Sequence, residues 1–368
     1  MAWNNWRAHY IRKLSSERIL NQVSRDIGSM SRTQIVGRAT LTRTLLICGS
    51  LLVVLVLALI GAAVIGSQSL PFAGSLCALS GSSNCALSAE ERAILFDIRL
   101  PRIVLAGAVG MCLAAAGAAY QALLRNPLAE PYLLGVSNGA AVGTMMALVF
   151  FTGYEWSRPI MAFAGAGAAT FVVYRLARGR AGATPERLIL AGVIVTTFLS
   201  SGIVFITTVM DATRIRSFTF WLLGDLSGTT GSLLIVAVIT AIIGGLVLTL
   251  KARSLNLMML GERDAFDLGV EVARVRLIVF GAASLLVGAS VASSGSVGYV
   301  GLVVPHLVRL SFGSDNRLVV PAAAIAGATF VIVADTLART LIAPRELPVG
   351  AITALIGAPL FVYLLKRG

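Results

Sequence analysis

Charge is scarce in this sequence. Only 13% of the 368 residues are Asp, Glu, Lys or Arg, whereas about 25% is usual for a soluble globular domain. Hydrophobic residues make up 57% of the chain, and its mean hydropathy is +0.86. This composition excludes a water-soluble fold and indicates an integral membrane protein.

Residue types that carry common enzymatic chemistry are also few. The three lysines, Lys13, Lys251 and Lys366, neither follow a glycine nor precede Ser or Thr, which excludes a P-loop for nucleotide hydrolysis. The two histidines, His9 and His306, have no acidic residues at metal-ligand spacing. We therefore expect no catalytic residues, no metal site and no cofactor bound by this chain. His306 fits a helix-packing role as well as a functional one.

Long stretches without charge dominate the chain. A membrane-spanning helix needs about 20 apolar residues, and nine charge-free windows approach or exceed that length. They are 44–89, 103–124, 131–154, 159–174, 188–210, 226–250, 277–308, 318–334 and 347–365. The first is apolar only to about Gly66, so it predicts one span followed by an outside loop at 67–98. The fold class is therefore an all-α integral membrane protein.

The two ends of the chain predict its orientation. Residues 1–43 contain eight Lys or Arg and two acids, and the chain ends with Lys366 and Arg367 before its last glycine, so both termini are expected in the cytoplasm. Two inside ends require an even number of crossings. Only 277–308 is long enough to cross twice, and it contains a glycine-rich break from Gly295 to Gly301. We predict ten spans, with a short, recessed return leg near 302–316.

The basic residues follow this topology. Of the 30 Lys and Arg residues, 22 fall in segments placed inside, so the net charge of +13 reports orientation and gives no indication of nucleic-acid binding. Eight arginines lie outside against the rule: Arg92, Arg99, Arg102, Arg158, Arg214, Arg216, Arg339 and Arg345. Arg99 and Arg102 lie at the mouth of span two, and Asp335 pairs by spacing with Arg339 on span nine. As a group they favour an acceptor for acidic groups over simple helix-end anchors.

The inside segment 257–272 has its own pattern. Its middle predicts a short amphipathic helix with Ala265, Leu268 and the methionines Met258 and Met259 on one side. Four acids in the same segment disfavour contact with an anionic lipid surface. A cytoplasmic protein partner is therefore the favoured cover for this apolar face.

Four cysteines fall into two classes. Cys48 and Cys112 lie within predicted spans and are expected to pack as small apolar residues. Cys77 and Cys85 share the first outside loop, where an oxidising exterior would permit a disulfide. Two free thiols are the alternative.

The longer motifs resemble those of one family, the permease subunits of type II ABC importers that handle iron-siderophores, heme and cobalamin. The markers are RLPR (99–102), QALLRNPLAEP (121–131), LLGVSNGA (133–140), LGERDAFDLGV (260–270), SVGYVGLVVPHLVRL (296–310) and ELPVGAITALIGAPLF (346–361). The resemblance runs from about Leu41 to the end. It implies a permease domain at 44–368 after a basic segment at 1–43, in the bacterial inner membrane. It also implies a homodimer, two ATPase subunits that bind ATP and Mg²⁺, and a periplasmic binding protein.

The same resemblance implies roles for particular residues. The segment that sits on the ATPase would comprise Gly261, Glu262, Arg263, Asp264, Ala265, Leu268 and Gly269. Arg99, Arg102 and Arg339 match the arginines that receive glutamates of the binding protein. The transport pathway would run along the dimer axis.

The cargo is left open by the family. Arg214 and Arg216 are suited to carboxylates such as heme propionates, and Phe220 and Trp221, with Phe218, are suited to a flat apolar ring. We rank heme first, other iron chelates second and cobalamin third. An aromatic belt at the membrane interface is the alternative role for these aromatics. A proton-coupled secondary transporter is the competing class, but Asp335 is its main candidate carboxylate and Arg339 neutralises it.

Overall fold

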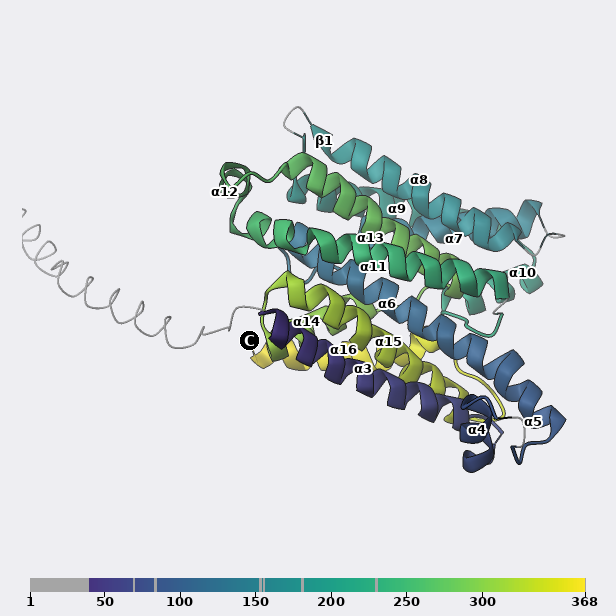
Figure 1. The fold of residues 1–368 in the computed structure, drawn as a ribbon. Helices are drawn as coiled ribbons and strands as arrows, with labels where there is room; N and C mark the ends of the chain where they lie inside the picture. The colour runs from purple at the N-terminus through teal and green to yellow at the C-terminus, as the bar shows by residue number, and fades with distance from the viewer. Residues whose placement is uncertain are drawn as a thin grey trace, which may run out of the picture. The chain divides into compact units, whose positions relative to one another are not determined.

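The computed structural model describes residues 40–367, apart from 69, 83–84, 152–153, 155, 180–181 and 229–230. Almost all of the basic segment predicted at 1–43 therefore lies outside the described residues. The described chain is a bundle of helices that run roughly parallel to one long direction (Figure 1). We name the end that carries α12 the cytoplasmic end, and the end that carries α4, α5 and α10 the outer end, after the predicted orientation.

Seven of the described helical stretches are long and apolar enough to cross a membrane. They are α3 (Leu41–Val64), the stretch Ala89–Leu123 that ends in α6 (Leu100–Leu123), α8 (Ser157–Ala177), α9 (Pro185–Val209), α11 (Gly231–Leu260), α13 (Val272–Ser294) and α15 (Asn316–Thr340). Three shorter apolar helices join them: α7 (Val136–Phe150), α14 (Val300–Phe312) and α16 (Val349–Arg367). Together they account for the ten predicted spans, and α14 is the predicted short return leg.

The helix α6 forms the centre of the bundle. In its apolar window 89% of the residues are buried, against 6% in α3. Alanine and glycine dominate α6 because neighbouring backbones pass very close to it: a Cβ on Gly117 would lie 1.9 Å from the Gly301 carbonyl oxygen, and one on Gly110 would lie 2.1 Å from that of Gly327. In lipid, no hydrophobic driving force brings helices together, so they associate through close van der Waals packing, which small residues at the crossings permit.

The break between α13 and α14 is held by the connection that precedes α7. The hydroxyl of Tyr132 accepts from the Val297 N–H at 3.0 Å and donates to the Val297 carbonyl at 2.9 Å. The Glu130 carboxylate accepts from the Tyr299 N–H at 3.3 Å. Non-helical backbone in a membrane protein needs such internal partners, so the two motifs containing Glu130 and Val297 fold against each other.

The outer loop predicted at 67–98 is largely helical. It contains α4 (Phe72–Leu79) and α5 (Ala89–Ala93), which begins with a capping box between Ser88 and Glu91, and the π-helical turn η1 (Ile94–Arg99) leads directly into α6. The second span therefore starts earlier than its charge-free window, because charged residues end an apolar run without ending a helix.

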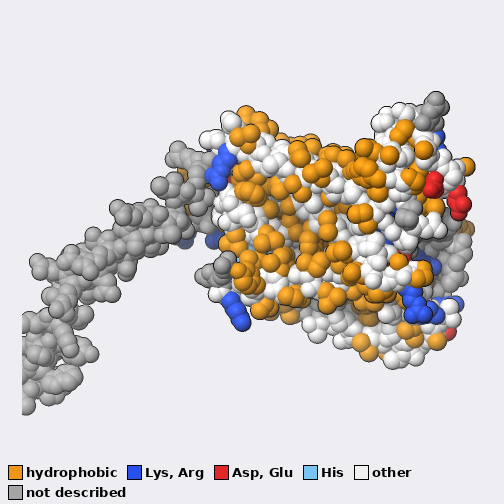
Figure 2. Space-filling model, turned by 90° about the horizontal axis from the view of Figure 1, so that it is seen from below, with side chains coloured by type: hydrophobic (Ala, Val, Ile, Leu, Met, Phe, Trp, Pro, Cys, Tyr) orange, Lys and Arg blue, Asp and Glu red, His pale blue; other side chains and the backbone are white. Residues whose placement is uncertain are grey.

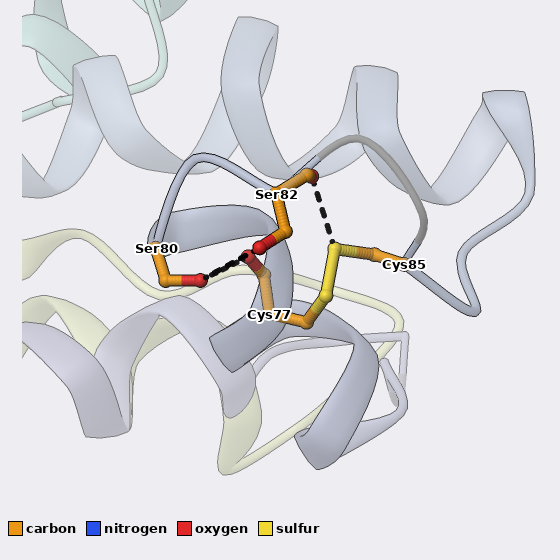
Figure 3. Close-up of a disulfide and its surroundings, with 4 residues drawn as sticks. All are labelled: Cys77, Ser80, Ser82 and Cys85. Atoms are coloured by element: carbon orange, nitrogen blue, oxygen red, sulfur yellow. Dashed lines mark hydrogen bonds between the residues drawn. A yellow bond between two sulfur atoms is a disulfide. The ribbon is translucent and has the colours of Figure 1, made fainter.

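A disulfide joins Cys77 of α4 to Cys85 across this loop, with the two Cα atoms 5.6 Å apart (Figure 3). The Ser80 hydroxyl donates to the Cys77 carbonyl at 2.7 Å. The Cys85 sulfur lies 3.1 Å from the Ser82 carbonyl oxygen, a close contact without a hydrogen bond because a disulfide sulfur carries no proton. The bond closes a small loop beside the start of the second span.

The surface matches a membrane environment. Hydrophobic side chains cover the middle of the face seen in Figure 2, and Lys and Arg side chains gather towards the two ends. On α3, for example, Leu45, Leu46 and Leu57 are all more than 60% exposed. Three short elements lie near the ends of the spans: the hairpin of β1 (Arg178–Gly179) and β2 (Gly182–Ala183), α10 (Ala212–Leu222) and α12 (Glu262–Asp267).

Candidate functional site

Two arginines at the outer end share one buried carboxylate. Arg102 of α6 contacts one oxygen of Asp335 at 2.9 Å, and Arg339 of α15 contacts the other at 3.0 Å, which confirms the predicted pairing of Asp335 with Arg339. Arg102 also pairs with Glu346 at 2.8 Å. The Asp335 side chain is 1% exposed, whereas that of Glu346 is 41% exposed. The outward-facing member of this cluster is therefore a carboxylate.

Arg99 performs a separate task. Its guanidinium donates to the carbonyls of Ala63 at 3.1 Å and Val64 at 2.9 Å, and to that of Gln68. These carbonyls lie at and just beyond the end of α3, where a cation offsets the negative end of the helix dipole. All three arginines predicted to receive the binding protein are thus less than 9% exposed and have partners within the chain. Their docking role stays a prediction.

The residues predicted at the pathway entrance lie on α10 and face different ways. Arg214 pairs with Asp211 at 3.0 Å, and Arg216 lies over the ring of Phe220 at 5.9 Å. Phe218 is buried and stacks on Trp221, with ring centroids 6.1 Å apart.

Phe220 and Trp221 line two different depressions at the outer end. Phe220 lines one of about 160 Å³, together with Arg102 and Glu346. Trp221 lines another of about 500 Å³, together with Trp156 and Arg158. The structure therefore brings Phe220 beside a predicted docking arginine, a proximity that their separation in the sequence could not reveal.

At the cytoplasmic end, the prediction that Ala265, Leu268 and the methionines share one apolar side of a helix is wrong. Ala265 is 0% exposed and packs inward, whereas Leu268 is 61% exposed, and α12 ends at Asp267, so helical periodicity does not extend to Leu268. The methionines Met258 and Met259 belong to the end of α11. In α12 and the turn after it the exposed apolar residues are Phe266, at 70%, and Leu268, and Met259 and Leu260 at the end of α11 are also exposed, at 38% and 69%.

Glu262, the first residue of α12, faces two arginines of the same chain. Its Oε1 lies 3.2 Å from Arg125, in the connection after α6, and 2.5 Å from Arg276 of α13. Arg276 is 4% exposed and also donates to the Ala183 carbonyl in β2. Sequence reasoning missed this cluster, although a cation five residues into a span, as Arg276 is in α13, signals a need for a buried partner.

The remaining predicted residues of this segment surround these contacts. Gly261 precedes α12 with a φ of 155°, Gly269 follows it with a φ of 84°, and both values favour glycine. Arg263 and Asp264 are exposed, and Arg263 lines a shallow depression of about 310 Å³ with Glu262, Phe266 and Asp267. The surface available to another protein therefore includes Arg263, Phe266, Asp267 and Leu268.

A model of the FecCD transport family matches residues 51–367. The chain belongs to this family. It is 40% identical over 330 residues to the hemin transport system permease protein HmuU of Yersinia pestis, covering 88% of this chain and 96% of that protein. It is equally 40% identical over 300 residues to the cobalamin import system permease protein BtuC of Halobacterium salinarum, covering 82% of this chain and 80% of the relative.

A solved structure supports the same assignment. It is titled as an inward-facing conformation of a metal-chelate type ABC transporter, and it matches this fold with a TM-score of 0.78 at 30% identity, over 88% of this chain and 99% of the other. The FecCD chain is therefore a multi-pass permease subunit of a type II ABC importer. It is not itself an enzyme, since members of the family work with a separate ATPase subunit and a substrate-binding protein.

Proposed function

We propose that this permease carries heme across the bacterial inner membrane, with other iron chelates as the next candidates. The observation that carries the proposal is the composition of α10. Arg214 is partly exposed and Arg216 is exposed, and Phe220 is 50% exposed on the same helix. Guanidinium groups pair well with propionate carboxylates, and an exposed aromatic ring suits a planar apolar ligand.

Cobalamin is the alternative cargo. It is favoured by the relatives whose names assign them cobalamin or vitamin B12, at 39–40% identity. Overall identity does not separate the two cargos because the hemin relative scores the same.

The proposal includes two copies of the chain. In this proposal α9, the fifth span, lines the pathway: only 17% of its apolar window is buried, and Phe198 and Phe205 are 76% and 71% exposed. Covering this face with a second copy would form a pathway between the two subunits. Both termini would lie in the cytoplasm, and two ATPase subunits would contact the surface formed by Arg263, Phe266, Asp267 and Leu268.

The periplasmic binding protein would dock at the outer end. Arg102 lines the depression beside Phe220, so a carboxylate of the partner would reach it there by displacing Glu346. The resemblance to the family implies that Arg99 and Arg339 also receive carboxylates of the binding protein, and because both are buried here, this would require them to leave their present partners. Cargo released from the binding protein would enter beside α10.

Reconstitution tests the whole proposal. The permease, its ATPase subunit and its cognate binding protein are placed in proteoliposomes, and uptake of heme, a ferric siderophore and cobalamin is measured with and without ATP. We expect ATP-dependent uptake of heme and a Soret shift when heme binds the binding protein. Uptake of cobalamin alone would establish the alternative cargo, and uphill uptake without ATP or a partner would refute the importer.

A further inference from the structure

Arg276 connects two parts of the cytoplasmic end that are far apart in sequence. Its Nη2 lies 2.5 Å from Glu262 at the start of α12, and its Nη1 donates to the carbonyl of Ala183 in β2. The side chain is 5% exposed. A guanidinium this buried needs partners for its charge and its N–H groups, and it finds them in Ala183 and in Glu262, which is 35% exposed.

On one side of Arg276, the contact determines how α12 sits. Glu262 points towards the protein because Arg125 and Arg276 both hold its Oε1. Ala265 is buried one turn later. With these two positions directed inward, Phe266 is directed outward. A force on the exposed face of α12 would therefore reach Glu262 and its arginines first.

On the other side, the contact reaches the helix proposed to line the pathway. Ala183 is followed directly by Thr184, whose side chain caps α9 by accepting from the Arg187 N–H at 3.4 Å. Displacing the Ala183 carbonyl therefore displaces the first turn of α9. No flexible linker separates β2 from that helix.

We propose that Arg276 is a positioning residue that transmits movement of α12 to α9. The proposal rests on the function above, in which the ATPase subunits act on the exposed face of α12. A guanidinium suits this role because its planar fork donates in two directions at once, whereas a lysine ammonium acts as a compact point charge. Arg276→Lys keeps the charge facing Glu262 but breaks the bridge to Ala183.

The test uses the assembled importer in proteoliposomes with heme-loaded binding protein, and it measures heme uptake and ATP hydrolysis on the same sample. We expect Arg276→Lys to lower the heme transported per ATP by roughly fivefold or more, a typical size for coupling between sites, while the ATPase subunit still co-purifies. A merely structural role would lower uptake and hydrolysis together and leave their ratio unchanged. That result would overturn the proposal.

Two further variants sharpen the experiment. Arg274→Lys is the matched control, since Arg274 is on the same helix but exposed, and within the described part of the chain its ion pair is with Glu271 at 3.5 Å. Arg274→Lys should leave the heme transported per ATP unchanged.

Gly182→Val strains β2, because Gly182 has a φ of 92°, without changing the ion pair of Arg276 with Glu262. It should lower the heme transported per ATP as Arg276→Lys does.

The wild-type protein separates the two possible failures. If wild-type vesicles show no ATP-driven heme uptake, the proposed function is wrong. If they transport heme and Arg276→Lys matches Arg274→Lys, the function stands and the transmission through Arg276 is wrong. Because Gly182→Val acts at the other contact, a poorly folding Arg276 variant leaves the proposal testable.

Discussion

The two ends of this permease each contain a carboxylate shared by two arginines, and the difference between them is informative. At the outer end Asp335 is 1% exposed and joins two spans, α6 and α15. At the cytoplasmic end Glu262 is 35% exposed and joins a short helix, α12, to α13 and to the connection after α6. The first arrangement stabilises the packing of two spans, whereas the second positions the segment that we propose contacts the ATPase subunit.

The largest expected effect is at Asp335. Asp335→Asn leaves Arg102 and Arg339 facing each other without the shared charge, and breaking a buried ion pair costs about 3–5 kcal/mol. We expect a large loss of folded protein in membranes and a lower thermal midpoint in detergent. Asp211→Asn, which removes an exposed pair with Arg214, is the control and should change stability by less than about 1 kcal/mol. Equal effects of the two variants would contradict the comparison.

The next largest effect concerns the cytoplasmic end. Phe266→Ala removes the most exposed apolar side chain of α12, and truncating an aromatic anchor in an interface costs about 2 kcal/mol or more. We expect roughly 30-fold weaker binding of the ATPase subunit, measured by titration of the solubilised complex. Glu262→Gln, by contrast, should leave this affinity within about threefold, because the Glu262 carboxylate is paired with Arg125 and Arg276 of its own chain. A greater loss with Glu262→Gln would place that residue in the interface.

A smaller effect is expected at Glu346, the exposed partner of Arg102. Glu346→Gln removes the charge that competes with a carboxylate of the binding protein, so docking should tighten by roughly fivefold, or about 1 kcal/mol. The measurement is the Kd of the loaded binding protein for the permease. Glu90→Gln, an equal change of charge on the exposed part of α5, controls for the overall field. Weaker docking of the Glu346 variant would show that Glu346 itself contacts the partner.

The smallest effect is at Asp315, which caps α15 by accepting from the Arg317 N–H at 3.0 Å. Burial alone raises the pKa of this carboxyl, but hydrogen bonds from Arg317 and Asn256 outweigh it and lower the pKa to about 2. The cap therefore stabilises the fold fully above the unfolded pKa of about 4 and progressively less as the pH falls towards 2.

Asp315→Ala should lower stability by about 1 kcal/mol at pH 6. Thermal unfolding in detergent should show the difference from wild type shrinking between pH 4 and pH 2. A difference that stays constant over this range would show that the charge of Asp315 does not contribute.

The spans were predictable because charge is excluded from lipid, and the glycine-rich break within 277–308 identified the short α14 correctly. The positions at which the spans end were not predictable from the charge-free windows. The helix α15 continues to Thr340, past Asp335 and Arg339, because those two charges neutralise each other inside the bundle. A window that stops at every charged residue cannot detect such pairing.

The sequence indicated which segments form the candidate sites but not which residues contact one another there. The motifs marked 99–102 and 260–270 as important, but the partners of Arg99 lie over 30 residues away along the chain, and Arg276 contacts Ala183 across a separation of 93 residues. The direction of α12 was also hidden, since a helix of six residues has too little periodicity to indicate which side is buried.

The close contacts of α6 have a consequence for how the permease changes conformation. Because the backbone at Gly117 touches that at Gly301, and Gly110 touches Gly327, α6 cannot slide or rotate against α14 or α15 without collision. These three helices are therefore expected to move as one rigid body. Opening and closing of the proposed pathway would then fall to helices with looser surroundings, above all α9, while α6, α14 and α15 stay fixed relative to one another.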